Sequence, residues 1–181
     1  MEDILLHTCC APCSTYVTDI LAQEYSITAF FYNPNIQPED EYEKRLADIR
    51  RLCDIKNISL LVPEHDVQSW HEIIKGREHE PEGGSRCRIC FEMRLQKTAE
   101  FARGLGFKKF ATTLTISPHK NTLLINKIGK EVSQKTGVVF LGGNFKKNDG
   151  YKKSCDLSSK FGLYRQKYCG CLYSISIKGA R

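Results

Sequence analysis

Cysteine is the residue type with the most chemical potential in this sequence, which holds nine cysteines among 181 residues. Cys9 and Cys10 are adjacent in the run His-Thr-Cys-Cys-Ala-Pro-Cys, and Cys87 and Cys90 form a CxxC pair at the expected start of a helix. Thiolates bind soft metals and iron–sulfur clusters, and the amides at a helix start favour the thiolate form. Adjacent thiols in a loop suit different irons of one cluster better than a single tetrahedral zinc, so these four cysteines predict an iron–sulfur centre.

A zinc site is the alternative, because Cys13 creates a second CxxC spacing and structural zinc is usually held by two such pairs. The zinc ligands would be Cys10, Cys13, Cys87 and Cys90. Arginines flank the second pair, and grouped guanidinium groups offset the negative charge of a thiolate-held cluster. They are Arg86, Arg88 and Arg94. This grouping favours an iron–sulfur cluster, and both metals stay open at this point.

A further dithiol, Cys169-Gly170-Cys171, lies near the C-terminus. A disulfide across one intervening residue closes a small strained ring, which is readily reduced. The pair therefore suits either redox cycling or the binding of a second metal. Cys53 lies on the apolar face of a predicted helix and Cys155 in a polar stretch, and we interpret both as structural.

The first residues and the hydropathy of the chain predict a cytoplasmic protein. Two acids precede a short apolar run, and no stretch approaches the roughly 18 consecutive apolar residues that a membrane span requires. We therefore expect no membrane partner and a reducing compartment, in which clustered thiols bind metal or do redox work. The formal charge of +6 predicts an anionic partner, either RNA or a phosphorylated small molecule.

The elements that must position these residues alternate between strand and helix patterns, which predicts an α/β fold with a five-stranded parallel sheet. The expected strands span 4–7, 27–32, 58–62, 107–114 and 138–141. The expected helices span 13–24, 39–56 and 121–136, with others around 67–74 and from 87 to 105. At this length we expect one catalytic domain over 1–181, with an α/β core at 1–145 and a basic C-terminal extension at 146–181 that carries the CxC dithiol.

Polar residues follow the predicted strands, at the edge where open parallel sheets bind their ligands. We therefore expect them to line one substrate pocket beside Cys9 and Cys10. The substrate-binding candidates are Asn33, Asn35, Thr115, Ser117, Lys146 and Lys147. His119, in the same loop as Ser117, is the candidate for proton transfer. The sequence has no GxxxxGK[ST] or GxGxxG phosphate loop, so nucleotide-cofactor binding has no direct support.

Lysines and arginine are interleaved with aromatic residues over 142–153 and 164–168, where Arg165 is a further substrate-binding candidate. Such a mixture suits RNA, because aromatic rings stack on bases and cations pair with phosphates. A solvated basic tail is the alternative interpretation.

Taken together, five motifs resemble the QueH family of cobalamin-independent epoxyqueuosine reductases, in the order of that family and over nearly the whole chain. The motifs are His7 to Cys13, Tyr32 to Ile36, Arg86 to Cys90, Thr113 to Asn121 and Tyr164 to Cys171. The family is also similar to the Rossmann-like, adenine-nucleotide α-hydrolase type of α/β fold. The ATP-binding loop of that fold is replaced here by Thr8 to Ser14, which argues against ATP chemistry.

The resemblance implies the last step of queuosine synthesis, the two-electron removal of the epoxide oxygen of epoxyqueuosine in tRNA with a GUN anticodon. It implies a [4Fe–4S] cluster held by Cys9, Cys10, Cys87 and Cys90, and an electron donor such as ferredoxin or flavodoxin. Cys169 with Cys171 would be a redox-active pair, and a second iron held by these two thiols is the other option. Two readings compete with the reductase: an ATP-dependent, thiolase-like tRNA-modifying enzyme and a zinc-stabilised RNA-binding module.

Overall fold

A five-stranded sheet forms the centre of the protein in a computed structural model that describes residues 1–175. Its order is β3-β2-β1-β4-β5, and every neighbouring pair is parallel. The strands are β1 (Glu2–His7), β2 (Tyr25–Phe30), β3 (Ser59–Leu61), β4 (Lys109–Thr112) and β5 (Val139–Phe140). The parallel α/β fold predicted from the strand and helix pattern is confirmed, and so is the Rossmann-like type that the family resemblance implies.

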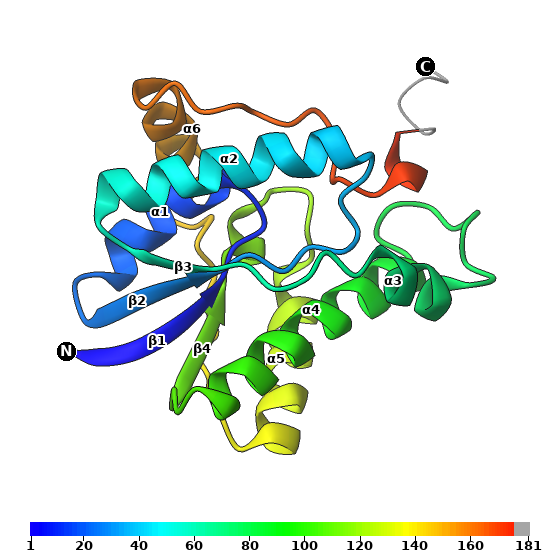
Figure 1. Cartoon of the computed structure of the whole chain (residues 1–181), viewed down its shortest axis with the longest axis horizontal. Helices are drawn as coiled ribbons and strands as arrows, with labels where there is room; N and C mark the ends of the chain where they lie inside the picture. The colour runs from blue at the N-terminus through cyan, green and yellow to red at the C-terminus, as the bar shows by residue number, and fades with distance from the viewer. Residues whose placement is uncertain (176–181) are drawn as a thin grey trace.

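Helices cover both faces of this sheet, with α1 and α2 on one side and α4 and α5 on the other (Figure 1). The helices are α1 (Ala11–Leu21), α2 (Glu39–Lys56), α3 (Val67–Ile74), α4 (Ser85–Gly104), α5 (Thr122–Thr136) and α6 (Gly150–Lys160). Two short 3₁₀ helices, η1 (Thr113–Ile116) and η2 (Leu172–Ser174), complete the described elements. None of the helices described in residues 1–175 is both long and apolar enough to cross a membrane.

The central strand β1 shows why the sheet needs both layers. Ile4 and Leu6 pack in one core with Val17 of α1, whereas Leu5 between them joins the opposite core with Leu95 of α4. Successive side chains of a strand point to opposite faces, so the apolar run from Ile4 to Leu6 must be covered on both faces of the sheet.

Helix α2 has the bounds that the sequence predicts, but other boundaries differ. The fourth predicted strand stops at Thr112 and continues as η1, which turns the following loop toward the sheet edge. Helix α4 begins at Ser85 rather than at Cys87, and it ends before Leu105, whose side chain is 56% exposed instead of apolar-face core.

Helix α6 was expected as part of a loop and basic tail, and that expectation is wrong. It packs along α1 through small residues, Gly150, Ser154 and Ser158, which are all buried. A Cβ on Gly150 would overlap the Phe145 carbonyl oxygen and lie 2.8 Å from a ring carbon of Tyr16 in α1, so the start of α6 has no space for a larger side chain. This buried face lacks the apolar periodicity from which a helix is recognised in sequence.

The strand order reverses at β1, which pairs with β2 on one side and β4 on the other. His7 and Thr112 are paired at the carboxyl ends of β1 and β4, so the loops that follow both strands begin side by side. Ligands of open α/β sheets bind at such a reversal point. The cysteine loop after β1 therefore starts where the fold places a site.

Candidate metal and redox site

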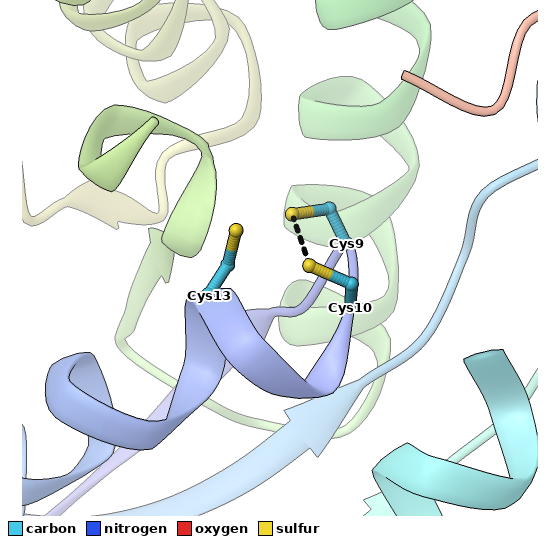
Figure 2. Close-up of side chains that lie close together, drawn as sticks. All are labelled: Cys9, Cys10 and Cys13. Carbon is cyan, nitrogen blue, oxygen red and sulfur yellow. Dashed lines mark hydrogen bonds between the residues drawn. The ribbon is translucent and has the colours of Figure 1, made fainter. Parts of the chain in front are cut away.

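Cys9, Cys10 and Cys13 bring three sulfur atoms within 4.8 Å of one another. Cys9 and Cys10 precede α1, and Cys13 lies in its first turn, so all three thiols face one space at the helix start (Figure 2). The Cys9 and Cys10 sulfurs are 3.8 Å apart. Pro12 sits in the first turn, where a missing backbone N–H costs nothing, and it fixes the point at which α1 begins.

The pKa values of the three thiols are shifted in different directions. Hydrogen bonds from Cys10 and Cys13 lower the pKa of Cys9 well below its usual value, and Lys120 and Thr113 act in the same direction. The hydrogen bond with Cys13 lowers the pKa of Cys10, but the hydrogen bond with Cys9 and burial together outweigh it and raise this pKa to about 12. Hydrogen bonding and burial also raise the pKa of Cys13. A metal bound here would displace the remaining protons, because thiolate is the ligand form.

Cys87 and Cys90 lie in the first turns of α4, and burial raises the pKa of both thiols. The Cys87 sulfur accepts the backbone N–H of Gly83 at 3.2 Å. Cys90 is buried with Trp70 and Cys171 in a small apolar cluster. Within residues 1–175, the compact set of sulfurs contains Cys13 and neither of these two predicted ligands. The predicted ligand set Cys9, Cys10, Cys87 and Cys90 therefore stays a prediction.

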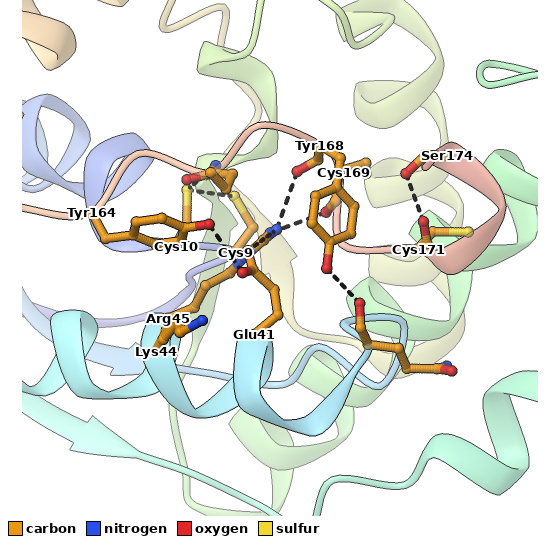
Figure 3. Close-up of polar contacts among 12 residues, drawn as sticks. Cys9, Cys10, Glu41, Lys44, Arg45, Tyr164, Tyr168, Cys169, Cys171 and Ser174 are labelled. Carbon is orange, nitrogen blue, oxygen red and sulfur yellow. Dashed lines mark hydrogen bonds and ion pairs between the residues drawn. The ribbon is translucent and has the colours of Figure 1, made fainter. Parts of the chain in front are cut away.

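The CxC segment is held against the start of α2 by backbone contacts (Figure 3). Arg45 donates to the carbonyl oxygens of Cys169 and Tyr168, both at 3.1 Å. The Gly170 carbonyl accepts from the N–H of Gln37 at 2.9 Å. Three successive carbonyls of the segment are thus bonded to residues 37–45, which sets the position of both thiols.

Arg45 is itself fixed by a buried ion pair with Glu41, one turn earlier on α2. Its Nη2 lies 2.7 Å from Glu41 Oε1, and the other carboxylate oxygen accepts the hydroxyl of Tyr164 at 3.0 Å. The guanidinium also lies over the ring of Tyr168, 5.3 Å from its centroid. Helix α2 and the C-terminal segment are therefore joined by one connected polar network, which the sequence did not predict.

Cys169 and Cys171 are both free thiols with different surroundings. Cys169 lines a cavity of about 240 Å³ together with Cys9 and Cys13. Cys171 is buried with Cys90, and burial raises its pKa to about 11. One thiol of the pair thus borders the cavity and the other faces the protein interior.

The cavity is rich in cations. Among the described residues its lining includes one carboxylate, that of Glu82, against four basic side chains. These are Arg45, Arg94, Lys120 and Lys167. Burial works against the charge of Lys120, but the negative charge that the neighbouring Cys169, Cys9 and Cys13 sulfurs carry when ionised outweighs burial and raises the pKa of Lys120. A cavity with this lining fits an anionic group.

Two predicted residues, Ser117 and His119, line this cavity beside the cysteines. Asn33 does not: its amide nitrogen donates to the Thr8 carbonyl at 2.9 Å, which ties the loop after β2 to the loop after β1. Asn35 and Thr115 are buried, and the side-chain oxygen of each has no hydrogen-bond partner in the described part of the chain. The structure thus gathers part of the predicted set around the sulfurs.

The predicted basic residues lie farther out. The Lys146 ammonium donates to the carbonyls of Ser117 and Lys120, at 3.3 and 2.9 Å, and so supports the loop that follows η1. Lys147 and Arg165 are exposed, and Arg165 donates to the Tyr151 hydroxyl at 3.4 Å. Their role toward a substrate stays a prediction.

Several site residues were missed from sequence. Gln166 donates to the Cys10 sulfur at 2.9 Å, and Arg45 and Lys120 line the cavity. Lys120 directly follows His119 in the loop after β4, so its position was a usable signal. Arg45 sits in a helix of alternating charges, where nothing local distinguishes it from its solvent-exposed neighbours.

His7 at the end of β1 is structural. Its Nε2–H donates to the Tyr32 carbonyl at 3.2 Å, and Nδ1 accepts from the Thr112 hydroxyl at 2.9 Å. Burial, with a smaller contribution from Arg94, lowers the pKa of His7 to about 4. The ring is therefore neutral at pH 7 and joins β1 and β4 to the segment after β2.

A family profile described as "Epoxyqueuosine reductase QueH" matches residues 4–176. "Epoxyqueuosine reductase QueH" of Streptococcus pyogenes serotype M1 is 43% identical over 182 residues, which cover 97% of this chain and 71% of the relative. The protein of the same name from Thermotoga maritima is 38% identical over 181 residues, 97% of this chain and 91% of the relative.

Among solved structures, a predicted subunit of tRNA methyltransferase from Methanocaldococcus jannaschii superposes with a TM-score of 0.58. It covers 88% of this chain and 76% of that chain at 11% identity, which shows a shared fold only. The sequence relatives carry the stronger conclusion, because their identity extends over nearly all of this chain and over most of their own length. This chain belongs to the epoxyqueuosine reductase QueH family.

Proposed function

We propose that this protein reduces epoxyqueuosine in tRNA to queuosine. Both carbon–oxygen bonds of the epoxide break, a carbon–carbon double bond forms, and the oxygen leaves as water after the uptake of two electrons and two protons. The observation that carries the proposal is one cation-lined cavity bordered by Cys9, Cys13 and Cys169 at the carboxyl edge of the sheet. Family membership supports it independently.

The proposed cofactor is a [4Fe–4S] cluster held by Cys9, Cys10, Cys87 and Cys90. The donor set fits an anionic thiolate-ligated group, because the surrounding cavity is cationic and one buried guanidinium nitrogen of Arg94 has no hydrogen-bond partner among residues 1–175. When bound, such a cluster supplies electrons one at a time. The two electrons of the reaction would come from a carrier such as ferredoxin or flavodoxin.

Cys169 and Cys171 have two proposed roles between which a measurement decides. They cycle between dithiol and disulfide, or they hold a second iron, for which the nearby Cys13 thiol is an available ligand. Cys13 and Cys169 line the same cavity, which supports the binding of a second iron. The separation of Cys169 and Cys171 by one residue supports the cycling between dithiol and disulfide.

The side chains around the cavity would handle the oxygen and its protons. Lys120 keeps its proton in this surrounding, so its ammonium stabilises negative charge that develops on the departing oxygen. His119 borders the same cavity and is exposed to solvent, so it is the proposed route for proton delivery. Ser117 lines the same cavity, and its hydroxyl accepts the backbone N–H of His119 at 3.3 Å.

The proposed partner is tRNA with a GUN anticodon, which places the reaction in the cytoplasm. A cavity of about 240 Å³ is smaller than a typical drug-sized ligand site of roughly 300–1,000 Å³, so it suits the modified part of one nucleotide. Residues 146–181, of which 176–181 lie outside the described residues, would complete one catalytic domain and carry exposed cations toward the tRNA. Lys152, Lys153 and Arg165 are exposed there.

An assay of queuosine formation on epoxyqueuosine-containing tRNA, under anaerobic reducing conditions, tests the activity. We expect turnover by the wild type, none by Cys9→Ala, and normal turnover by Cys53→Ala, which removes a thiol from the α2 core. A wild type that binds the tRNA but leaves the epoxide unchanged would refute the proposed reaction.

Metal analysis of anaerobically purified protein tests the cofactor separately. About four irons per chain are expected for one [4Fe–4S] cluster, and a clear excess would assign the CxC pair to a second iron. Zinc in place of iron would refute the cluster and favour a zinc-stabilised RNA-binding module.

A further inference from the structure

Arg94 is a buried cation with an unused hydrogen-bond donor. Its side chain lies in the interior of the protein, 2% exposed, on the second turn after Cys87 in α4. Nε donates to the Cys90 carbonyl at 3.1 Å, and Nη1 lies 3.5 Å from Asn33 Oδ1. Nη2 is buried and has no hydrogen-bond partner among residues 1–175.

No carboxylate of residues 1–175 pairs with this charge. Within the described residues, no Asp or Glu oxygen lies within 4.0 Å of the Arg94 guanidinium, although Arg45 in the same cavity has Glu41 at 2.7 Å. A buried charge without a partner is costly, and proteins normally pair it. The charge of Arg94 therefore requires an anionic partner other than a carboxylate.

Cysteine sulfurs, which are anionic when they bind a metal, surround Arg94. Burial alone would lower the pKa of Arg94, but the charge that Cys90, Cys169, Cys9 and Cys87 carry when ionised outweighs burial and raises it. Three of these four cysteines belong to the proposed cluster ligands, and Arg94 lines the cavity next to Cys9 and Cys169. Among residues 1–175, where no carboxylate pairs with Arg94, the groups that balance its charge are therefore cysteines, most of them at the proposed cluster site.

We propose that Arg94 is a positioning residue for the metal centre: its Nη2 donates a hydrogen bond to a sulfur of the thiolate-held cluster, and its charge stabilises the reduced state. This inference rests on the proposed function, in which a cluster is bound. Reduction adds one electron and one unit of negative charge without moving a proton, since the guanidinium stays charged throughout. A fixed cation and an N–H donor beside the sulfurs raise the reduction potential of such a centre.

Arg88 provides the matched control. It lies on the same helix, between Cys87 and Cys90 in sequence, and carries the same charge, but its side chain is exposed. Water screens an exposed charge, so Arg88 should have little influence on the potential despite its closeness along the chain.

The test is a reductive titration of the anaerobically loaded protein, followed by electron paramagnetic resonance of the reduced cluster. For Arg94→Met we expect the equilibrium constant for reduction to fall at least tenfold, which equals a potential about 59 mV more negative for a one-electron couple. Arg94→Lys, which keeps the charge but not the planar fork, should shift it less. Arg88→Met should match the wild type.

Two results would overturn the role of Arg94. One is an equilibrium constant for reduction in Arg94→Met that lies within twofold of the wild-type constant, and the other is an equal shift in Arg88→Met. If Arg94→Met fails to hold iron, Arg94→Lys and Arg94→Gln decide, because one keeps the charge and the other keeps only an N–H donor. Wild-type potentials in both of these variants would overturn the proposal. Absence of any iron–sulfur signal in the wild type would instead refute the cofactor in the proposed function.

Discussion

At the scale of single residues, one side-chain type serves different purposes because its surroundings differ. Cys53 is buried among the apolar residues of α2, and burial raises its pKa to about 11, so it stays an inert thiol. Cys9 lies at the start of α1 beside two other thiols and Lys120, and its pKa is lowered. Position at the sheet edge, rather than residue type, separates the reactive cysteines from the structural one.

Replacement of Cys169 by serine tests the proposed division of labour among the cysteines. We expect Cys169→Ser to lose turnover at least a hundredfold, because serine neither cycles through a disulfide nor binds iron as thiolate does. The visible absorbance of the cluster should persist, since Cys169 is outside the proposed ligand set. Loss of both turnover and absorbance would contradict that ligand set, and Cys53→Ser is the control for thiol removal.

Gly170 tests how tightly the CxC segment must be placed. Its φ of +111° favours glycine, and a Cβ there would lie 2.9 Å from Ile36 Cγ1 and 3.2 Å from Arg45 Nη1. Gly170→Ala should reduce turnover at least tenfold in the tRNA assay, because the added carbon pushes the segment away from Arg45. Gly76→Ala is the matched control, since Gly76 also has a positive φ of +81° but nothing within 4 Å. Equal losses in both variants would assign the effect to backbone strain alone.

At the scale of elements, α2 is the support on which the C-terminal segment rests. The buried pair of Arg45 with Glu41 satisfies carbonyls more than 120 residues away along the chain, at sequence separations of 123 and 124. The neighbouring pair of Lys44 with Asp40 has the same spacing but is exposed on the outer face of the helix. Two ion pairs of equal spacing on one helix therefore differ in role, because among residues 1–175 only the pair of Arg45 with Glu41 hydrogen-bonds to the C-terminal segment.

This difference predicts different stabilities. Arg45→Met should lower the free energy of unfolding by about 3–5 kcal/mol, because it leaves the buried Glu41 carboxylate without a counter-charge and two carbonyls without their donor. Lys44→Met should change it by about 0.5 kcal/mol or less, as is typical of an exposed pair. Chemical denaturation followed by circular dichroism measures both. The double variant Glu41→Gln with Arg45→Met should recover part of the loss, and a further loss would contradict the pairing argument.

At the scale of the whole molecule, the formal charge of +6 is relevant to where a polyanion binds. Exposed basic residues lie on α6 and on the segment that leads to the cavity, and others lie on α5 across the sheet. Arg165 is next to Gln166 of the cavity lining, whereas Lys130 is on α5 beside a shallow pocket that contains none of the site residues.

Salt dependence of tRNA binding distinguishes these two faces. Arg165→Gln should weaken binding and make the log–log salt slope shallower by roughly 0.7–0.9, the value for one lost phosphate contact. Lys130→Gln removes the same charge from the opposite layer and should leave affinity and slope near those of the wild type. Filter binding at several salt concentrations provides the comparison, and an equal effect of both variants would show that only net charge matters.

The sequence by itself determined the α/β class, the extent of α2 and the loops that carry the chemistry. These features depend on local periodicity and on the rule that parallel strands end at one edge, so residues close in sequence are enough to predict them. Ser117, His119 and the Cys9 to Cys13 loop reached the cavity edge for that reason.

Only the tertiary structure decided the existence of α6, the network of Arg45 and the unbalanced charge of Arg94. Helix α6 buries glycine and serines because α1 lies close to it, and no local pattern in the sequence predicts that close packing. In sequence Arg45 looks like any helix-surface arginine, and Arg94 is one of three arginines near the CxxC pair with nothing to show that it is buried. Burial against segments distant along the chain gives Arg45 its partners and leaves one Arg94 nitrogen without any among the described residues. Contacts between distant segments depend on how whole elements pack, and this information is spread over the chain rather than held in any one motif.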